Sequence, residues 1–190
     1  PHAGYLYSGQ VAAYGYKLLQ RADPKLVFLI GPSHRVGFKG FSVSQYSGYK
    51  TPLGVAPVDQ DLAKKLLSIN PQMKWVPEAD DQEHSLEIQI PFLQAVLKDF
   101  HIVPIIMGDQ SYAGSRALGV ALAKLIQKET GTAGQPVSED TAEDTLIVAS
   151  SDLSHYHPYD DAVRIDRKTL NAVQEWDYLS MSRNFEQGVW

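Results

Sequence analysis

Three near-continuous apolar runs constrain the fold of this chain more than any other feature. The runs LVFLI (26–30), IVPIIM (102–107) and TLIVAS (145–150) are rich in Val and Ile. Such runs are typical of strands that are covered on both faces. Segments of helical periodicity lie between and beside them, at residues 9–21, 60–68, 84–98, 112–128 and 159–176. Strands that alternate with helices predict an α/β domain with a largely parallel central sheet flanked by helices.

Shorter signals refine this prediction. Residues 41–46 (FSVSQY) alternate between apolar and polar side chains, which favours a half-exposed or edge strand. Ser8 and Asp59 precede helical segments, and we expect both to act as N-caps. Residues 51–54 (TPLG) indicate a turn. Pro91 lies inside the segment 84–98 and lacks an N–H donor, so it should kink that helix or mark its true start.

Size and charge exclude several classes of function. A chain of 190 residues fits one domain with a substantial core. Its net charge of −5, without a visible basic patch, gives no reason to expect nucleic acid or an anionic membrane as a partner. The longest apolar run is too short to span a bilayer. The absence of cysteine excludes disulfides within this stretch and fits a reducing, cytoplasmic location.

The two ends of the sequence indicate a piece of a longer protein. The chain begins at Pro1 rather than at a methionine, and it stops at Trp190 without an obvious closing element. We interpret residues 1–190 as a single domain truncated at both ends. A signal sequence in the parent protein stays open on this evidence.

Two histidine-bearing turns follow predicted strands. GPSH places His34 after the strand at 26–30, and SSDLSHY places Asp152 and His155 after the strand at 145–150. In open α/β sheets, ligands bind beyond the carboxyl ends of the strands. Imidazole suits metal binding and proton transfer because its neutral form is available near pH 7. A single histidine could simply cap a helix, but two at comparable strand ends favour a functional site.

Two further segments offer candidate site residues. PHAGY contains His2 and Tyr5 and resembles a strand-to-helix turn, and Tyr5 could line a pocket or pack in the core. The segment DQEHSLE offers Glu83, His84 and Glu87 at the start of a predicted helix, where carboxylates are favoured by the helix dipole in any case. It matches neither zinc-protease pattern, H-E-x-x-H or H-x-x-E-H. Whether His84 faces the pocket is therefore an open alternative.

Other catalytic motifs are absent from the sequence. It contains no G-x-S-x-G elbow, no P-loop and no G-x-G-x-x-G. Serine hydrolase, NTPase and dinucleotide-binding functions therefore have no support.

Five motifs in a fixed order identify a family resemblance. PHAGYLYSG, VFLIGPSH, YKTPLG, EHSLEIQIPFLQ and SSDLSHY occur in this order, and the resemblance covers roughly residues 1 to 175. The chain thereby resembles the Memo-like family, which is named for a human mediator of cell motility. Microbial members of that family are called AmmeMemoRadiSam system protein B.

The resemblance implies a fold and a set of site residues. Memo-like proteins are similar in fold to class III extradiol ring-cleaving dioxygenases, which hold non-haem iron with two histidines and a carboxylate. It implies that His2 and His34 are metal ligands and that His155 is an acid–base histidine sharing their pocket with Asp152. The family's third protein ligand is usually a cysteine at a position beyond Trp190. Asp152 would then orient His155, or would itself supply the third ligand.

The resemblance also implies cofactors and partners. Fe(II) is the expected metal, with copper or zinc as alternatives, and the third protein ligand lies outside this chain. One hypothesis is a metal-dependent oxidoreductase that acts on a small aromatic substrate. The other is a non-catalytic module that binds a peptide or phosphotyrosine in the same cleft. An intact third ligand would favour the first hypothesis, and a basic cleft rim would favour the second. The oligomeric state is left open.

Overall fold

The computed structural model describes residues 1–131 and 144–186 of this chain. The chain divides into two compact units, Pro1–Ser151 and Asp152–Trp190. The prediction that residues 1–190 form one domain stays a prediction.

A five-stranded sheet forms the centre of the first unit. Its order is β5-β2-β6-β1-β7, and every neighbouring pair is parallel except β2 with β6. The strands are β1 (Leu26–Pro32), β2 (Phe41–Val43), β5 (Met73–Lys74), β6 (His101–Met107) and β7 (Thr145–Ala149). The three apolar runs thus form β1, β6 and β7, as predicted. The mostly parallel α/β fold expected from the sequence is confirmed.

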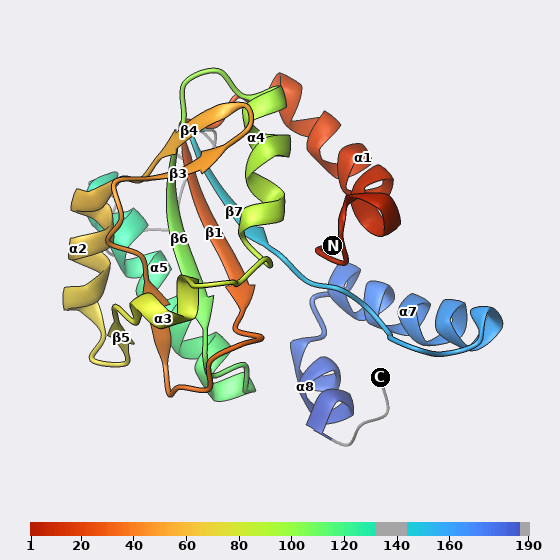
Figure 1. Ribbon diagram of the computed structural model, residues 1–190. Coiled ribbons are helices and arrows are strands. Elements are labelled where there is room, and N and C mark those ends of the chain that lie inside the picture. Colours follow the sequence, from red (N-terminus) through yellow and green to blue (C-terminus); the bar gives the residue numbers. More distant parts are fainter. Residues whose placement is uncertain (132–143, 187–190) are drawn as a thin grey trace. The chain divides into compact units, whose positions relative to one another are not determined.

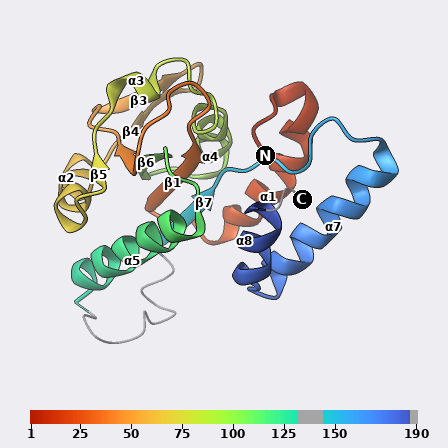
Figure 2. The same ribbon diagram turned by 90° about the horizontal axis from the view of Figure 1, so that it is seen from below.

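Helices cover both faces of this sheet (Figures 1 and 2). One face packs against α2 (Gln60–Ile69) and α5 (Tyr112–Glu129), and the other against α1 (Gln10–Leu18) and α4 (Ile90–Val96). Shorter elements complete the unit: a single-turn π-helix η1 (Tyr5–Gly9), the 3₁₀ turns η2 (Leu19–Arg21) and η3 (Glu87–Gln89), helix α3 (Pro77–Asp80), and the hairpin β3 (Gly48–Thr51) with β4 (Gly54–Pro57).

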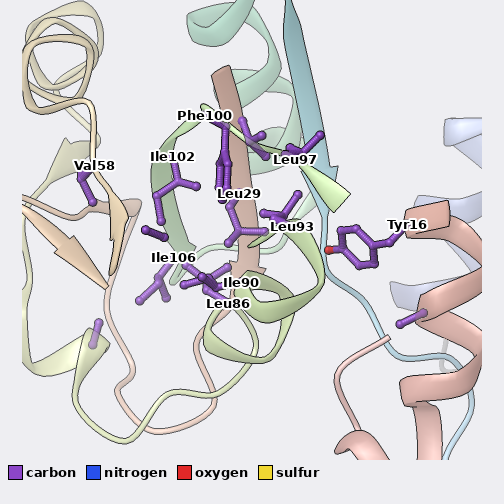
Figure 3. Close-up of a cluster of buried hydrophobic side chains, with 14 residues drawn as sticks. Tyr16, Leu29, Val58, Leu86, Ile90, Leu93, Leu97, Phe100, Ile102 and Ile106 are labelled. Atoms are coloured by element: carbon purple, nitrogen blue, oxygen red, sulfur yellow. The ribbon is translucent and has the colours of Figure 1, made fainter. Parts of the chain in front are cut away.

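The packed core explains why this arrangement is stable. Leu29 of β1 and Ile102 of β6 are fully buried against Ile90 and Leu93 of α4, as Figure 3 shows. Burying a side chain of this size contributes about 1.5–3 kcal/mol. Tyr16 of α1 belongs to the same cluster, with its hydroxyl directed away from its own helix. The core therefore fixes α1 and α4 against one face of the sheet.

Several local predictions are wrong, each for a physical reason. Ser8 does not cap α1, because it lies inside the π-helix and its hydroxyl donates to the Gly4 carbonyl. Strand β2 is not an edge strand, since β5 and β6 pair with its two sides and bury it. The helix predicted over 84–98 begins only at Ile90. Pro91 therefore marks the true start of the helix, which was one of its two predicted effects. Asp59 does cap α2, accepting a hydrogen bond from the Leu62 N–H at 2.9 Å.

The second unit contains two helices, α7 (Tyr159–Gln174) and α8 (Tyr178–Glu186). Helix α7 confirms the periodicity at 159–176. Residues 132–143, between α5 and β7, lie outside the described residues. Among the helices that are described, none is both long and apolar enough to cross a membrane.

Candidate metal centre

The carboxyl end of β1 brings His34 to the edge of the sheet. Strand β1 ends at Pro32, and Ser33 continues its register by donating its backbone N–H to the Met107 carbonyl at 3.0 Å. Gly31 allows the segment after Glu83 to approach β1 closely, because a Cβ at this position would lie 2.7 Å from the Ser85 hydroxyl oxygen. Glycine is therefore required here by packing, and His34 follows in a fixed loop.

The Glu83 carboxylate fixes this loop through hydrogen bonds to His34. Its Oε2 accepts the backbone N–H of His34 at 2.6 Å, and its Oε1 lies 2.9 Å from Nδ1 of the same residue. The backbone N–H groups of His84 and Ser85 also donate to Oε1, at 2.8 and 2.9 Å. The carboxylate itself is almost completely buried, with its side chain 2% exposed. Four donors thus converge on one buried carboxylate.

These contacts fix the protonation state of Glu83 and the tautomer of His34. Burial alone would raise the pKa of Glu83, but hydrogen bonds from His34, Ser85 and His84 outweigh it and lower the pKa to about 2. An ionised carboxylate can only accept hydrogen bonds, so Nδ1 of His34 must carry the proton. The lone pair of neutral His34 is then on Nε2. This is how carboxylates behind metal-ligating histidines orient the ring.

His2 enters the same region from the N-terminal turn. Its ring is buried, and its Nδ1 lies 2.8 Å from the Ser150 hydroxyl oxygen. Ser150 is the first residue after β7, and its backbone N–H donates to the Ile30 carbonyl of β1 at 2.7 Å. The contact between His2 and Ser150 therefore lies at the carboxyl edge shared by β1 and β7.

Three imidazole rings converge at this edge. The ring centroids of His2 and His34 are 5.2 Å apart, those of His2 and His84 are 5.8 Å apart, and those of His34 and His84 are 5.0 Å apart. His34, Glu83 and His84 each offer a ligand atom, and these atoms all lie within 4.8 Å of one another. Because Glu83 already accepts four hydrogen bonds, the imidazoles are the better donors for a metal ion. The donor set fits a borderline transition metal such as Fe(II), copper or zinc.

His84 differs from the other two histidines in how it is held. Its ring stacks on His34 with an interplanar angle of 25°, and its side chain is 46% exposed. Its Nδ1 lies 3.6 Å from the Glu83 Oε1, which is beyond hydrogen-bonding distance. The ring therefore lines the accessible side of the cluster.

The remaining predicted site residues make contacts of their own. Tyr5 packs its ring 5.8 Å from that of Phe92, and burial followed by the charge of Glu87 raises its pKa. Asp152 and His155 belong to the second unit, with 3.8 Å between Asp152 Oδ2 and His155 Nε2. Nδ1 of His155 donates to the Leu153 carbonyl at 2.7 Å. That His155 joins the pocket of His2 and His34 stays a prediction.

Sequence reasoning missed the residues behind the histidines. Glu83 was visible beside His84, but its position fitted a helix dipole equally well. Ser150 is the residue at which an apolar strand run ends. Glu83 and Ser150 lie within the ordered motifs, but the motifs do not show which histidine each contacts, because His34 and His2 lie 49 and 148 residues away in the sequence.

The fold and the histidine cluster define an α/β protein with a candidate metal site at the carboxyl edge of its sheet. Residues 1–188 match the family model described as Memo-like protein. The chain belongs to this Memo-like family. It is 34% identical to a MEMO1 family protein of Metallosphaera sedula over 98% of this chain and 63% of that relative. It is 36% identical to a MEMO1 family protein of Thermotoga maritima over 93% of this chain and 60% of that relative.

The chain thus spans about three fifths of the length of the curated relatives it matches. A solved structure of an uncharacterized protein from Escherichia coli K12 is 19% identical and has a TM-score of 0.47. The matched region covers 76% of the present chain and 54% of the Escherichia coli protein's chain. This likeness is too weak to carry a functional argument.

Proposed function

We propose that this chain supplies the imidazole ligands of a mononuclear metal centre in an oxidoreductase of extradiol dioxygenase type. The observation that carries the proposal is the pair of supports behind His34 and His2. Glu83 fixes the proton of His34 on Nδ1, and Ser150 contacts the Nδ1 of His2. In both rings Nε2 is the nitrogen that we propose as the metal donor. Fe(II) is the metal we expect, with copper and zinc as alternatives.

The roles of the residues follow from their environments. His2 is buried, and the ring of His34 is oriented by the Glu83 carboxylate, as ligands of fixed geometry require. His84 is half-exposed and stacked on His34, so it faces the substrate side of the pocket. A bound metal would supply Lewis acidity and, for iron or copper, redox chemistry. A small aromatic substrate would lie against the exposed face of His84.

Proton transfer is the role we propose for His155, with Asp152 as its neighbour. The Leu153 carbonyl fixes a proton on Nδ1 of His155, so Nε2 is the nitrogen that can accept and return a proton. Asp152 lies three residues earlier, with its Oδ2 3.8 Å from Nε2 of His155. The third protein ligand lies outside this chain in our proposal, and a cytoplasmic location remains a prediction.

Metal titration tests the proposal directly. The protein at the length of its relatives is stripped of metal and titrated anaerobically with Fe(II), and separately with Cu²⁺ and Zn²⁺. We expect His2→Ala and His34→Ala each to weaken binding of the preferred metal by at least tenfold. His101→Ala is the matched control, because His101 is an exposed residue at the start of β6, the opposite end of that strand from the site.

The outcomes separate the two hypotheses. Equal loss of metal in all three variants, or no loss in any, would contradict the proposed ligands. A protein that binds none of these metals would leave the second hypothesis, a non-catalytic module for a peptide or phosphotyrosine. Titration of the 190-residue chain beside the longer protein would show whether a ligand beyond Trp190 is needed.

A further inference from the structure

A chain of buried hydrogen bonds lies behind His2. It runs from the Tyr16 hydroxyl to Gln89, from Gln89 to the Ser150 hydroxyl, and from that hydroxyl to the Ser85 carbonyl. The donor–acceptor distances are 2.8, 2.8 and 2.7 Å. His2, Tyr16, Ser85, Gln89 and Ser150 are all more than nine-tenths buried. Water cannot easily replace these bonds, so the proton on each group is determined by its partners.

The Pro1 carbonyl determines the orientation of the Gln89 amide. Its Nε2 lies 2.9 Å from the Pro1 carbonyl oxygen, which can only accept a hydrogen bond. The NH₂ group of Gln89 must therefore be on this side, and its second N–H donates to the Ser150 hydroxyl oxygen. Its Oε1 then accepts from the Tyr16 hydroxyl, whose pKa is raised by burial and which stays protonated.

The Ser150 hydroxyl donates its single proton in a hydrogen bond to the Ser85 carbonyl. A hydroxyl can donate only one hydrogen bond, and here the Ser85 carbonyl oxygen accepts it. The hydroxyl oxygen accepts one hydrogen bond from Gln89 and has one lone pair left for His2. The His2 Nδ1 must therefore donate, since the hydroxyl has no second proton to give. Neutral His2 then carries its proton on Nδ1 and its lone pair on Nε2.

We propose that Ser150, oriented by Gln89 and Tyr16, is the positioning residue that holds neutral His2 in the Nδ1–H tautomer. This inference rests on the proposed function for its purpose, which is to keep Nε2 of His2 ready to bind a metal. It assigns the two histidines different supports. The ionised Glu83 carboxylate contacts Nδ1 of His34, whereas the neutral Ser150 hydroxyl contacts Nδ1 of His2. These two contacts therefore add only one negative charge to the site.

The tautomer can be measured without any metal. Long-range ¹H–¹⁵N correlation spectra of protein labelled with ¹⁵N-histidine, recorded over a pH series, distinguish the two tautomers of a neutral ring from each other and from the charged ring. We expect His2 of the wild-type protein to be in the Nδ1–H form. Ser150→Ala removes the acceptor, so the Nε2–H form should become populated. Ser150→Thr keeps the hydroxyl and should restore the wild-type pattern.

Ser42→Ala is the matched control for a purely structural effect. Ser42 is a buried serine whose hydroxyl accepts from the Val76 N–H at 2.9 Å, far along the chain from His2. Its loss should lower stability and leave the His2 tautomer unchanged. Zn²⁺ serves as the diamagnetic probe of binding, and Ser150→Ala should weaken it by about 10- to 100-fold, with recovery in Ser150→Thr.

The outcomes separate this inference from the proposed function. A wild-type His2 in the Nε2–H form would overturn the inference, and so would an Nδ1–H form that persists in Ser150→Ala. If Ser150→Ala does not fold, the wild-type spectrum and Ser150→Thr still decide the tautomer. Failure of the wild-type protein to bind Zn²⁺, Fe(II) or Cu²⁺ while His2 is Nδ1–H would reject the metal centre and leave the positioning role intact.

Discussion

Replacing Glu83 by glutamine tests how strongly the buried carboxylate stabilises the site. Glutamine has nearly the same shape, but it offers one acceptor oxygen and one NH₂ group where glutamate offers two acceptors. Three donors reach Oε1, so the amide oxygen should occupy that position. The NH₂ group then faces the backbone N–H of His34, which donates to Oε2 at 2.6 Å in the wild-type protein.

The expected cost follows from these contacts. A buried donor left without an acceptor costs about 1–3 kcal/mol, and the three remaining hydrogen bonds lose the strength that an ionised acceptor gives them. Glutamine is less costly to bury than an ion, which offsets part of this loss. The depression of the Glu83 pKa from 4.5 to about 2 corresponds to a similar figure, about 3 kcal/mol. We therefore expect Glu83→Gln to destabilise the protein by about 3 kcal/mol.

Differential scanning calorimetry and urea unfolding measure this change. For a protein of this size, 3 kcal/mol corresponds to a fall in Tm of about 6–12 °C. Glu87→Gln is the matched control, because Glu87 is exposed, and it should change the free energy of unfolding by less than about 0.5 kcal/mol. If Glu83→Gln is no less stable than Glu87→Gln, the buried carboxylate does not hold this loop.

Two other measurements test the same region. The folded pKa of Glu83 lies below its unfolded value, so its stabilisation is present above about pH 4.5 and is lost as pH falls towards 2; the stability gap between wild type and Glu83→Gln should therefore close over that range in urea titrations, and a constant gap would contradict the assignment. Gly31→Ala places a Cβ 2.7 Å from both Leu86 Cδ2 and the Ser85 hydroxyl oxygen, and it should cost about 1–3 kcal/mol. Gly37→Ala, with no atom within 4 Å of the added carbon, should be nearly neutral, and equal effects of the two alanines would refute the close-approach argument.

The elements that sequence alone predicted well are those whose signal is local. The runs that form β1, β6 and β7 are continuous and apolar, and α2 begins at an aspartate cap that the sequence makes visible. Such patterns depend on neighbours a few residues away. They fix the type of each element and, through the alternation of strands and helices, the α/β class.

The segment 81–89 shows where local periodicity fails. The apolar spacing of residues 84–98 predicted a helix from residue 84, yet residues 81–86 form a loop before η3 and α4. The backbone N–H groups of His84 and Ser85, which would have no intrahelical acceptor in the first turn of a helix that starts at residue 84, donate to the Glu83 carboxylate. The same carboxylate also binds His34 across 49 residues of sequence. A long-range demand of the site therefore overrides the local preference for helix.

The supports of the two histidines could not be found from the sequence for the same reason. Glycine, serine and proline before a histidine at a strand end are visible locally, so His34 was predicted from its own turn. The contact between His2 and Ser150 joins residues 148 positions apart, and that between Gln89 and Ser150 spans 61. Only the parallel pairing of β1 with β7, which places Ser150 beside the end of β1, brings them together. A histidine in a strand-end turn therefore marks a candidate site, whereas its tautomer, and with it the nitrogen that can bind a metal, is decided by residues that only the folded sheet makes neighbours.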